Sequence, residues 1–236
     1  MTPEIIPVRS ASPSPIECRH CSATAPVDEH FCPQCSRILS MSRHGDYFWF
    51  FGLPRRLSID PQDLERRFRD LSRKFHPDFY YNALPGERLA SLERSSYLND
   101  AYRALKQASS RVEYLLTIEG LPLTASHEGA AKVPPGLLEE VFALNEELDE
   151  IRELREAGAD PAVLRTRLDE ARRPIEEKRA EHERTVNELS ERWDAQADAP
   201  PAARRATLES LREQLLERNY IANLLATIER EAAANG

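Results

Sequence analysis

The stretch Pro61–Phe75, PQDLERRFRDLSRKF, and the tripeptide His76-Pro77-Asp78 that follows it decide the first part of the fold. Apolar side chains recur in this stretch at intervals of four, three and four residues: Leu64, Phe68, Leu71 and Phe75. This is the periodicity of one face of an α-helix. Asp60-Pro61 is a typical helix start, with the aspartate as N-cap. Pro77 should end the helix, because the residue before a proline is pushed out of the α conformation.

The same stretch carries five basic and three acidic residues, so its net charge is +2. Basic residues that lie mostly off the apolar stripe include Arg66, Arg69, Arg73 and Lys74. The functional interpretation is that His76, Pro77 and Asp78 form an exposed turn that contacts a partner, while the basic face steers the approach. An ordinary helix stop followed by a Pro-Asp turn is the alternative interpretation of these residues alone.

A second helix is expected to start near Pro85-Gly86-Glu87. Its apolar and small residues are Leu89, Leu92, Ser96, Leu98, Ala101, Tyr102 and Leu105. Two antiparallel helices joined at an exposed His-Pro-Asp (HPD) loop resemble a J domain, the module that stimulates the ATPase of DnaK-type chaperones.

Further motifs narrow the resemblance to the HscB family, the J-type co-chaperones of iron–sulfur cluster assembly. The matching strings are Asp46-Tyr47-Phe48, Phe51-Gly52-Leu53-Pro54, Phe68-Arg69-Asp70-Leu71, His76-Pro77-Asp78-Phe79, Leu98-Asn99-Asp100-Ala101-Tyr102 and Ser110-Arg111-Val112-Glu113-Tyr114-Leu115-Leu116. The last string, with the Gly120-Leu121 that follows, is not a feature of general J proteins. The similarity spans roughly residues 46–236 and is strongest before residue 120.

All four cysteines lie within eighteen positions, as two Cys-x-x-Cys pairs: Cys18, Cys21, Cys32 and Cys35. Such pairs present two thiolates from one tight turn, and together they supply the four sulfurs of a tetrahedral ion. We predict a structural Zn²⁺ site, with rubredoxin-like iron as a competitor. Two disulfides are a further alternative, which the lack of an export signal argues against. His20 and His30 lie beside the cysteines and are interpreted as bystanders. A similar cysteine-rich extension occurs on some members of the HscB family.

The second half of the chain is acidic and helical. Residues 121–236 carry sixteen basic and twenty-five acidic residues. We expect one helix from Leu137 to about Gly158, a long helix from Pro161 to about Trp193 with a kink at Pro174, and a last helix after Pro200-Pro201. Three such helices should form an antiparallel bundle.

The HscB resemblance implies that this bundle binds the IscU-type scaffold on which clusters are built. The scaffold-facing residues of the family fall on Leu138, Phe142, Glu146, Glu150 and Tyr220 of this chain. Glu139 and Ala143 depart from the enterobacterial pattern, in which an apolar residue and an acid are usual. Leu138 and Phe142 could instead be bundle core, and Glu146 and Glu150 a solvated face.

Composition limits the other functional classes. The net charge of −8 and the acidic second half argue against nucleic acid as the main ligand. There is neither a membrane-spanning apolar run nor a recognisable signal peptide, so we expect a cytoplasmic protein. The remaining histidines, His44, His127 and His182, are scattered, and no phosphate-binding GxxxxGK[ST] motif occurs. We therefore do not expect an enzyme.

Together these features predict an all-α fold: a J-domain helical hairpin and a three-helix antiparallel bundle, preceded by a small four-cysteine metal module. The predicted boundaries are a disordered N-terminus at 1–17, the metal module at 18–44, the J domain at 45–120, a linker at 121–136 and the bundle at 137–236. The resemblance implies a DnaK/HscA-type ATPase and an IscU-type scaffold as partners. A homodimer could form through the metal module. A general J protein for unfolded clients and a metal-module adaptor are the alternative functions.

Overall fold

The computed structural model describes residues 15–26, 29–40, 45–123, 133–197 and 199–234. Apart from one two-stranded hairpin, its regular elements are helices, which confirms the predicted all-α class. The chain divides into two compact units, one made of residues 1–55 and 59–107 and the other of residues 56–58 and 108–236. Most of the predicted N-terminal segment 1–17 and of the predicted linker 121–136 lies outside the described residues.

The first unit is built on a hairpin of two helices, α2 (Pro61–Phe75) and α3 (Pro85–Lys106). The side chain of Asp60 accepts a hydrogen bond of 2.9 Å from the Gln62 backbone N–H, as expected of an N-cap. The short helix α1 (Tyr47–Phe50) precedes α2, and a 3₁₀ turn, η1 (Pro77–Tyr80), begins directly after His76. The helix starts predicted at Pro61 and Pro85 are therefore confirmed.

The core of this hairpin is aromatic and contains buried polar residues. Its buried apolar side chains are Phe48, Phe50, Phe51, Leu64, Phe75, Ala90, Leu98, Ala101 and Leu105. Ser91 and Arg94 of α3 are buried among them. By contrast, Leu89 and Leu92 are about half exposed on the outer face of α3.

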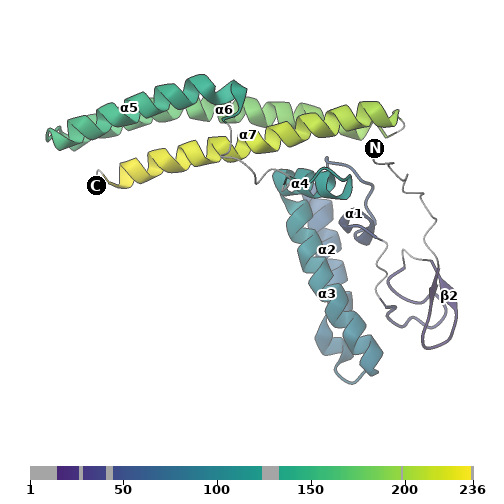
Figure 1. Cartoon of the computed structure of the whole chain (residues 1–236). Coiled ribbons are helices and arrows are strands. Elements are labelled where there is room, and N and C mark those ends of the chain that lie inside the picture. Colours follow the sequence, from purple (N-terminus) through teal and green to yellow (C-terminus); the bar gives the residue numbers. More distant parts are fainter. Residues whose placement is uncertain (1–14, 27–28, 41–44, 124–132, 198, 235–236) are drawn as a thin grey trace, which may run out of the picture. The chain divides into compact units, whose positions relative to one another are not determined.

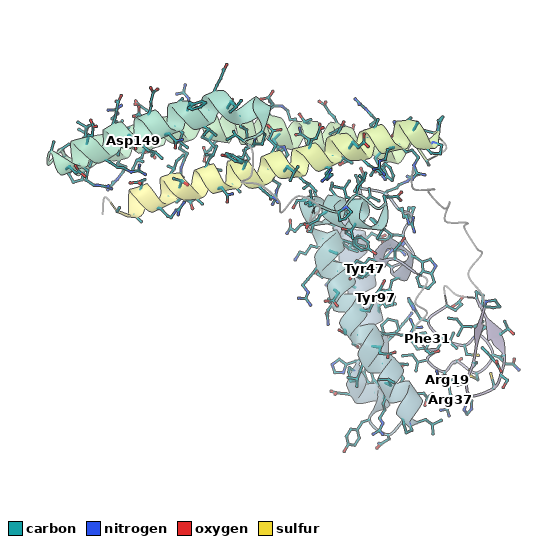
Figure 2. All side chains as sticks on the ribbon, in the orientation of Figure 1. Arg19, Phe31, Arg37, Tyr47, Tyr97 and Asp149 are labelled. Atoms are coloured by element: carbon teal, nitrogen blue, oxygen red, sulfur yellow. The ribbon has the colours of Figure 1, made fainter. Side chains whose placement is uncertain are left out.

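A small cysteine-containing module, residues 15–26 and 29–40, belongs to the same unit. Its strands β1 (Ile16–Glu17) and β2 (Thr24–Ala25) pair antiparallel, and an isolated bridge joins Phe31 to Ile38. Phe31 and Arg37 lie on its side toward the helical hairpin (Figure 2), where Phe31 meets the ring of Phe75 and Arg37 pairs with Glu87 at 2.9 Å. The module is thus docked on α2 and α3.

The second unit contains α4 (Ala108–Ile118), the 3₁₀ turn η3 (Pro135–Leu137), α5 (Leu138–Glu156), α6 (Pro161–Ala195) and α7 (Pro201–Ala233). Helices α5, α6 and α7 lie side by side, and short turns make successive helices antiparallel (Figure 1). Gly158, with a φ of 81°, follows α5, and Asp160 caps α6. Helix α6 continues through Pro174.

Two apolar clusters hold this unit together. One joins α4 to the adjoining ends of α6 and α7: Val112, Leu115, Leu116, Leu189, Trp193, Leu208, Leu211 and Leu215. The other joins α5 to the rest of α6 and α7: Leu144, Leu148, Ile151, Leu164, Leu168, Ile175, Ile221, Leu224 and Ile228. The buried His182 lies between these stretches of α6 and bonds to Gln214 of α7 at 2.8 Å.

Residues 56–58 are anchored in this unit, although they precede α2 in the sequence. The Asp194 carboxylate of α6 accepts hydrogen bonds from the backbone N–H groups of Leu57 and Ser58, at 2.7 and 2.8 Å. The buried Arg111 guanidinium of α4 donates to the Leu57 carbonyl. Leu57 itself enters the apolar cluster of α4, α6 and α7.

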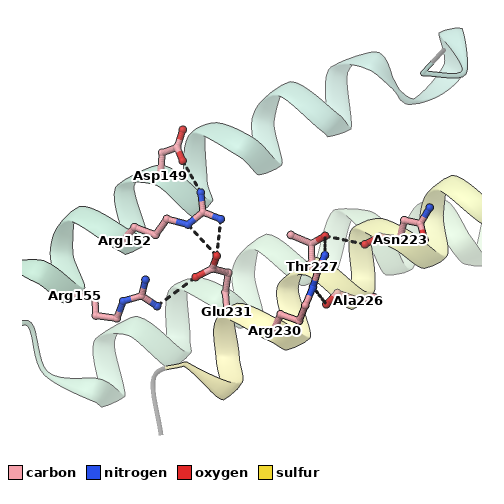
Figure 3. A network of polar contacts seen from close by, with 8 residues as sticks. All are labelled: Asp149, Arg152, Arg155, Asn223, Ala226, Thr227, Arg230 and Glu231. Carbon is pink, nitrogen blue, oxygen red and sulfur yellow. Dashed lines mark hydrogen bonds and ion pairs between the residues drawn. The ribbon is translucent and has the colours of Figure 1, made fainter. Parts of the chain in front are cut away.

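At the end of the unit that holds the C-terminal part of α5, ion pairs join α5 to α7 beside the apolar cluster (Figure 3). Glu231 of α7 accepts from Arg152 of α5 at 2.9 Å and from Arg155 at 3.3 Å. Arg152 also donates to Asp149 at 2.8 Å, so one guanidinium joins two carboxylates. Hydrogen bonds from Arg152 hold the pKa of Glu231 below its ordinary value.

None of the helices in the described part of the chain combines the length and the apolar character that crossing a lipid bilayer requires.

Candidate functional site

The HPD loop exposes its two titratable side chains. The side chain of His76 is 51% exposed and that of Asp78 is 86% exposed. The Asp78 backbone N–H donates to Nδ1 of His76 at 3.3 Å, which holds the imidazole over the turn. Within the described residues, the other ring nitrogen, Nε2, has no partner. Nε2 of His76 and the Asp78 carboxylate are therefore accessible from solvent.

The base of the loop is fixed by α3. The Phe75 carbonyl does not accept a backbone hydrogen bond from Phe79, because the Phe79 N–H donates to the His76 carbonyl instead. Two hydroxyls replace that bond: Ser91 donates to the Phe75 carbonyl at 2.7 Å and Ser95 at 2.9 Å. The orphan carbonyl at the helix end is thus satisfied twice by side chains. On the other side of the turn, the Tyr80 hydroxyl bonds to the Lys74 carbonyl at 3.0 Å.

The basic face of α2 is partly neutralised within the helix. Arg69 pairs with Glu65 at 3.2 Å, while Arg66 and Arg73 pair with acids three residues before them. Lys74, in the last turn, is the one predicted basic contact without an ion pair in the described part of the chain. Exposed pairs of this kind are weak and can exchange partners, so the guanidinium groups stay accessible to acidic groups of another molecule.

The four cysteines come from two turns of matching geometry. In each turn the serine after the second cysteine bonds back to the carbonyl of the first, at 2.8 Å: Ser22 to Cys18, and Ser36 to Cys32. Both serines adopt left-handed backbone angles, with φ of 56° and 58°. The cysteine-rich segment is therefore a repeated knuckle, each copy of which presents two thiols.

The sulfurs fit a tetrahedral ion. All four Sγ atoms lie within 4.8 Å of one another, with Cys18–Cys35 at 3.7 Å and Cys21–Cys32 at 3.6 Å. A tetrahedral ion with bonds of about 2.3 Å would hold sulfurs roughly 3.8 Å apart. All four are free thiols, so the disulfide alternative is wrong. The four-cysteine cluster predicted from the spacing is confirmed and could bind a metal, and the identity of the metal stays a prediction.

The knuckle backbone favours thiolates. The N–H groups of Cys21 and His20 lower the pKa of the Cys18 thiol to about 7. The N–H of Cys35 likewise lowers the pKa of Cys32 below its ordinary value. The pKa values of the second cysteines move the other way: burial and the neighbouring thiols raise the pKa of Cys21, and raise that of Cys35 to about 12.

The predicted scaffold-binding residues of α5 lie on the surface. Leu138 is 41% exposed and Phe142 is 68% exposed, so these two are not bundle core. Glu146 is exposed one turn farther along the helix. The departures from the family pattern, Glu139 and Ala143, are exposed too.

The last two predicted scaffold residues, Glu150 and Tyr220, differ from this group because each contacts other residues of the bundle. The Glu150 carboxylate is engaged by Arg167 of α6 at 2.6 Å, in a network that includes Glu147. Tyr220 of α7 is half-buried against the second apolar cluster, and within the described residues no ring contact joins it to Phe142. Leu216, one helical turn before Tyr220, is 42% exposed and was not singled out from the sequence.

The other residues that the sequence reasoning missed are Ser91, Ser95, Arg94 and the docking role of His30. One signal was available: Arg94 falls on the same helical stripe as Ala90, Leu98 and Ala101. An arginine in an apolar stripe of a helix predicts a buried polar contact, but not the partner of that contact.

No protein-family model matches the chain. Among solved structures, the human co-chaperone protein HscB is similar, with a TM-score of 0.63 and 24% identity over 90% of this chain and 96% of that one. The chaperone HscB from Vibrio cholerae is also similar, with a TM-score of 0.52 and 26% identity over 79% of this chain and 96% of that one. The resemblance to HscB co-chaperones that the motifs indicate is thus confirmed, and this chain has the HscB fold together with a four-cysteine cluster.

Proposed function

We propose that this protein is a co-chaperone of iron–sulfur cluster assembly. Its bundle binds an IscU-type scaffold, and its HPD loop stimulates the ATPase of a DnaK/HscA-type chaperone, so that ATP hydrolysis drives transfer of the cluster. The protein is not itself the ATPase and acts as a binding protein in the cytoplasm.

The observation that carries the proposal is the geometry of the HPD loop. His76 and Asp78 project into solvent from a turn whose backbone is held by Ser91 and Ser95. A preorganised turn of this kind loses little entropy when a partner binds. The neighbouring basic helix face supplies attraction toward an acidic partner surface.

The α5 face supports the scaffold half of the proposal. Leu138 and Phe142 place two large apolar groups on the surface, and the acids Glu146 and Asp149 follow on the exposed side of the helix. An exposed aromatic group surrounded by polar residues is typical of a protein-binding surface. Leu216 and Tyr220 add a second helix to the apolar surface of the unit.

The test is a single-turnover ATPase assay with the cognate chaperone. His76→Gln should reduce stimulation to near the unstimulated rate, because the chaperone would lose its contact with Nε2 of the imidazole. His20→Gln is the matched control, since His20 is exposed and outside the loop. Stimulation by His76→Gln equal to that by wild type would show that the loop does not act on the chaperone.

The alternatives make different predictions. Deletion of residues 1–45 removes scaffold binding if the cysteine module is an adaptor surface, and leaves it intact if the bundle binds the scaffold. A general J protein would fail to retain a scaffold in a pull-down, and Tyr220→Ala would then change nothing.

The closed set of four thiolates leaves no open coordination position, so the metal, which we propose to be Zn²⁺, would have a structural role. Zinc analysis of the purified protein should give one ion per chain. Iron in place of zinc would contradict this assignment.

A further inference from the structure

Arg94 attaches the cysteine module to the helical hairpin. This arginine of α3 is only 2% exposed. Its guanidinium donates to three acceptors in the module: the Leu39 carbonyl at 3.1 Å, Nδ1 of His30 at 2.7 Å and the Ser40 carbonyl at 3.3 Å. None of these acceptors is a carboxylate, and burial lowers the pKa of Arg94 to about 10. A charge this deeply buried needs all three hydrogen bonds, so undocking the module would leave it unsatisfied.

His30 continues this chain of hydrogen bonds. Because its Nδ1 accepts from Arg94, the proton lies on Nε2, which donates to the Phe50 carbonyl at 3.1 Å. Its ring also packs against Phe50 and Phe75, with centroid distances of 4.8 and 5.0 Å. His30 is therefore held in one orientation, and its ring packs against the aromatic core of the hairpin.

One of the residues that His30 contacts is Phe75, which lies immediately before the HPD loop. Phe75 is fully buried, and two consecutive residues of the module cover its ring: His30 at 5.0 Å and Phe31 at 5.8 Å. The guanidinium of Arg94 lies 5.6 Å from the same ring. Ring and carbonyl of Phe75 are thus both fixed, the ring by the module and the carbonyl by Ser91 and Ser95.

The covering residues are tied directly to the metal site. Cys32 follows Phe31 in the sequence, and its N–H bonds to the Arg37 carbonyl at 2.8 Å within the second knuckle. The apolar cluster inside the module consists of Cys18, Ala25, Cys32 and Leu39, so two of the four buried residues of this cluster are predicted metal ligands. A core this small cannot hold its fold without a metal. Loss of the metal should therefore uncover Phe75.

We propose that His30 and Phe31 are positioning residues for the HPD loop, and that the metal-bound cysteine module braces the loop through Phe75. This inference rests on the proposed co-chaperone function. The metal site is then more than a local fold stabiliser, because metal binding and chaperone binding are coupled through one aromatic contact. Coupling between two binding sites is reciprocal, so the chaperone must tighten metal binding by the same factor as the metal tightens chaperone binding.

The test uses the full-length protein and has two readouts. The first, without any partner, is the hydrogen exchange of the Asp78 and Phe79 backbone amides, measured by NMR with zinc bound and after chelation. Exchange should accelerate on chelation. The second is the zinc dissociation constant from chelator competition, with and without the ATP-bound chaperone. The chaperone should lower this constant by about fivefold or more.

Phe31→Ala should accelerate loop exchange even with zinc bound, and should abolish the effect of the chaperone on zinc affinity. Arg37→Ala is the comparison variant, because it removes the other docking contact, the pair with Glu87, and leaves the ring contact with Phe75 in place; it should accelerate loop exchange less than Phe31→Ala does. If Phe31→Ala loses its zinc, Arg94→Met tests the docking of the module from the side of α3. This change keeps the metal site and removes the hydrogen bonds of Arg94 to the module.

The outcomes separate the two proposals. If the chaperone is stimulated normally while zinc removal leaves the Asp78 and Phe79 amides unchanged, the brace is refuted and the co-chaperone function stands. The same conclusion holds if the zinc dissociation constant is identical with and without the chaperone. If the chaperone neither binds nor responds to zinc-loaded wild type, the proposed function itself fails, and the coupling fails with it.

Discussion

Truncating Phe142 to alanine should separate scaffold binding from folding. Phe142 is 68% exposed, so roughly one third of the residue is buried. Full burial of a phenylalanine side chain stabilises a fold by about 1.5–3 kcal/mol, which leaves about 0.5–1 kcal/mol for this fraction. An aromatic group at the centre of an interface contributes about 2 kcal/mol or more, which corresponds to roughly a thirtyfold change in Kd.

The assay is calorimetric titration of an IscU-type scaffold into wild type and Phe142→Ala, with thermal unfolding of the same samples. Leu148→Ala is the matched control, because Leu148 is a buried residue of the same helix. It should cost about 2–5 kcal/mol of stability. Scaffold affinity unchanged in Phe142→Ala, or a loss of stability as large as that of Leu148→Ala, would refute the assignment of this face.

Two further predictions concern polar contacts. Replacing both Ser91 and Ser95 by alanine removes both side-chain hydrogen bonds to the Phe75 carbonyl and should destabilise the protein by about 1–3 kcal/mol in denaturant unfolding. Each single change should cost less than half of that, because the other hydroxyl still bonds to the carbonyl. Additive effects of the two changes would contradict this shared role. Because the folded-state pKa of Glu231 is lowered by Arg152, its stabilisation is present above the unfolded pKa of about 4.3 and is lost as pH falls through the folded value. Glu231→Gln should therefore lower stability by about 1 kcal/mol at pH 7 and by less at pH 2, and an equal effect at both pH values would refute the ion pair.

Local signals in the sequence were sufficient for the starts of α2, α3 and α6 and for the end of α5. Asp60-Pro61, Gly158 and Asp160-Pro161 each mark a helix end that the structure places within a residue or two. These signals work because capping and proline effects depend on neighbours in the chain. The spacing of the cysteines was equally informative, because two knuckles need only short-range geometry to present four thiols.

Contacts between distant segments could not be predicted in the same way. His30 was interpreted as a bystander of the metal site, and its actual partners, Phe50 and Arg94, are twenty and sixty-four residues away. Helical periodicity states which residues face inward but not what meets them there. The surface position of Phe142 likewise depends on how α5 is rotated about its axis against α6. Apolar residues at the start of α5 lie on more than one face of the helix, so the sequence did not decide which of them are buried.

The anchoring of Leu57 by Asp194 sets an order of events during synthesis. Leu57 leaves the ribosome long before α6 and α7, whose residues supply its carboxylate cap and its apolar surroundings. Until those helices appear, Leu57, Val112, Leu115 and Leu116 have no apolar cover from them. A chain cut at residue 120 would keep this surface exposed permanently and should associate or be degraded, since exposed apolar patches promote aggregation. The apolar cluster would thus be complete only after the last helix is made, so the unit proposed to bind the scaffold also covers apolar residues that precede it in the sequence.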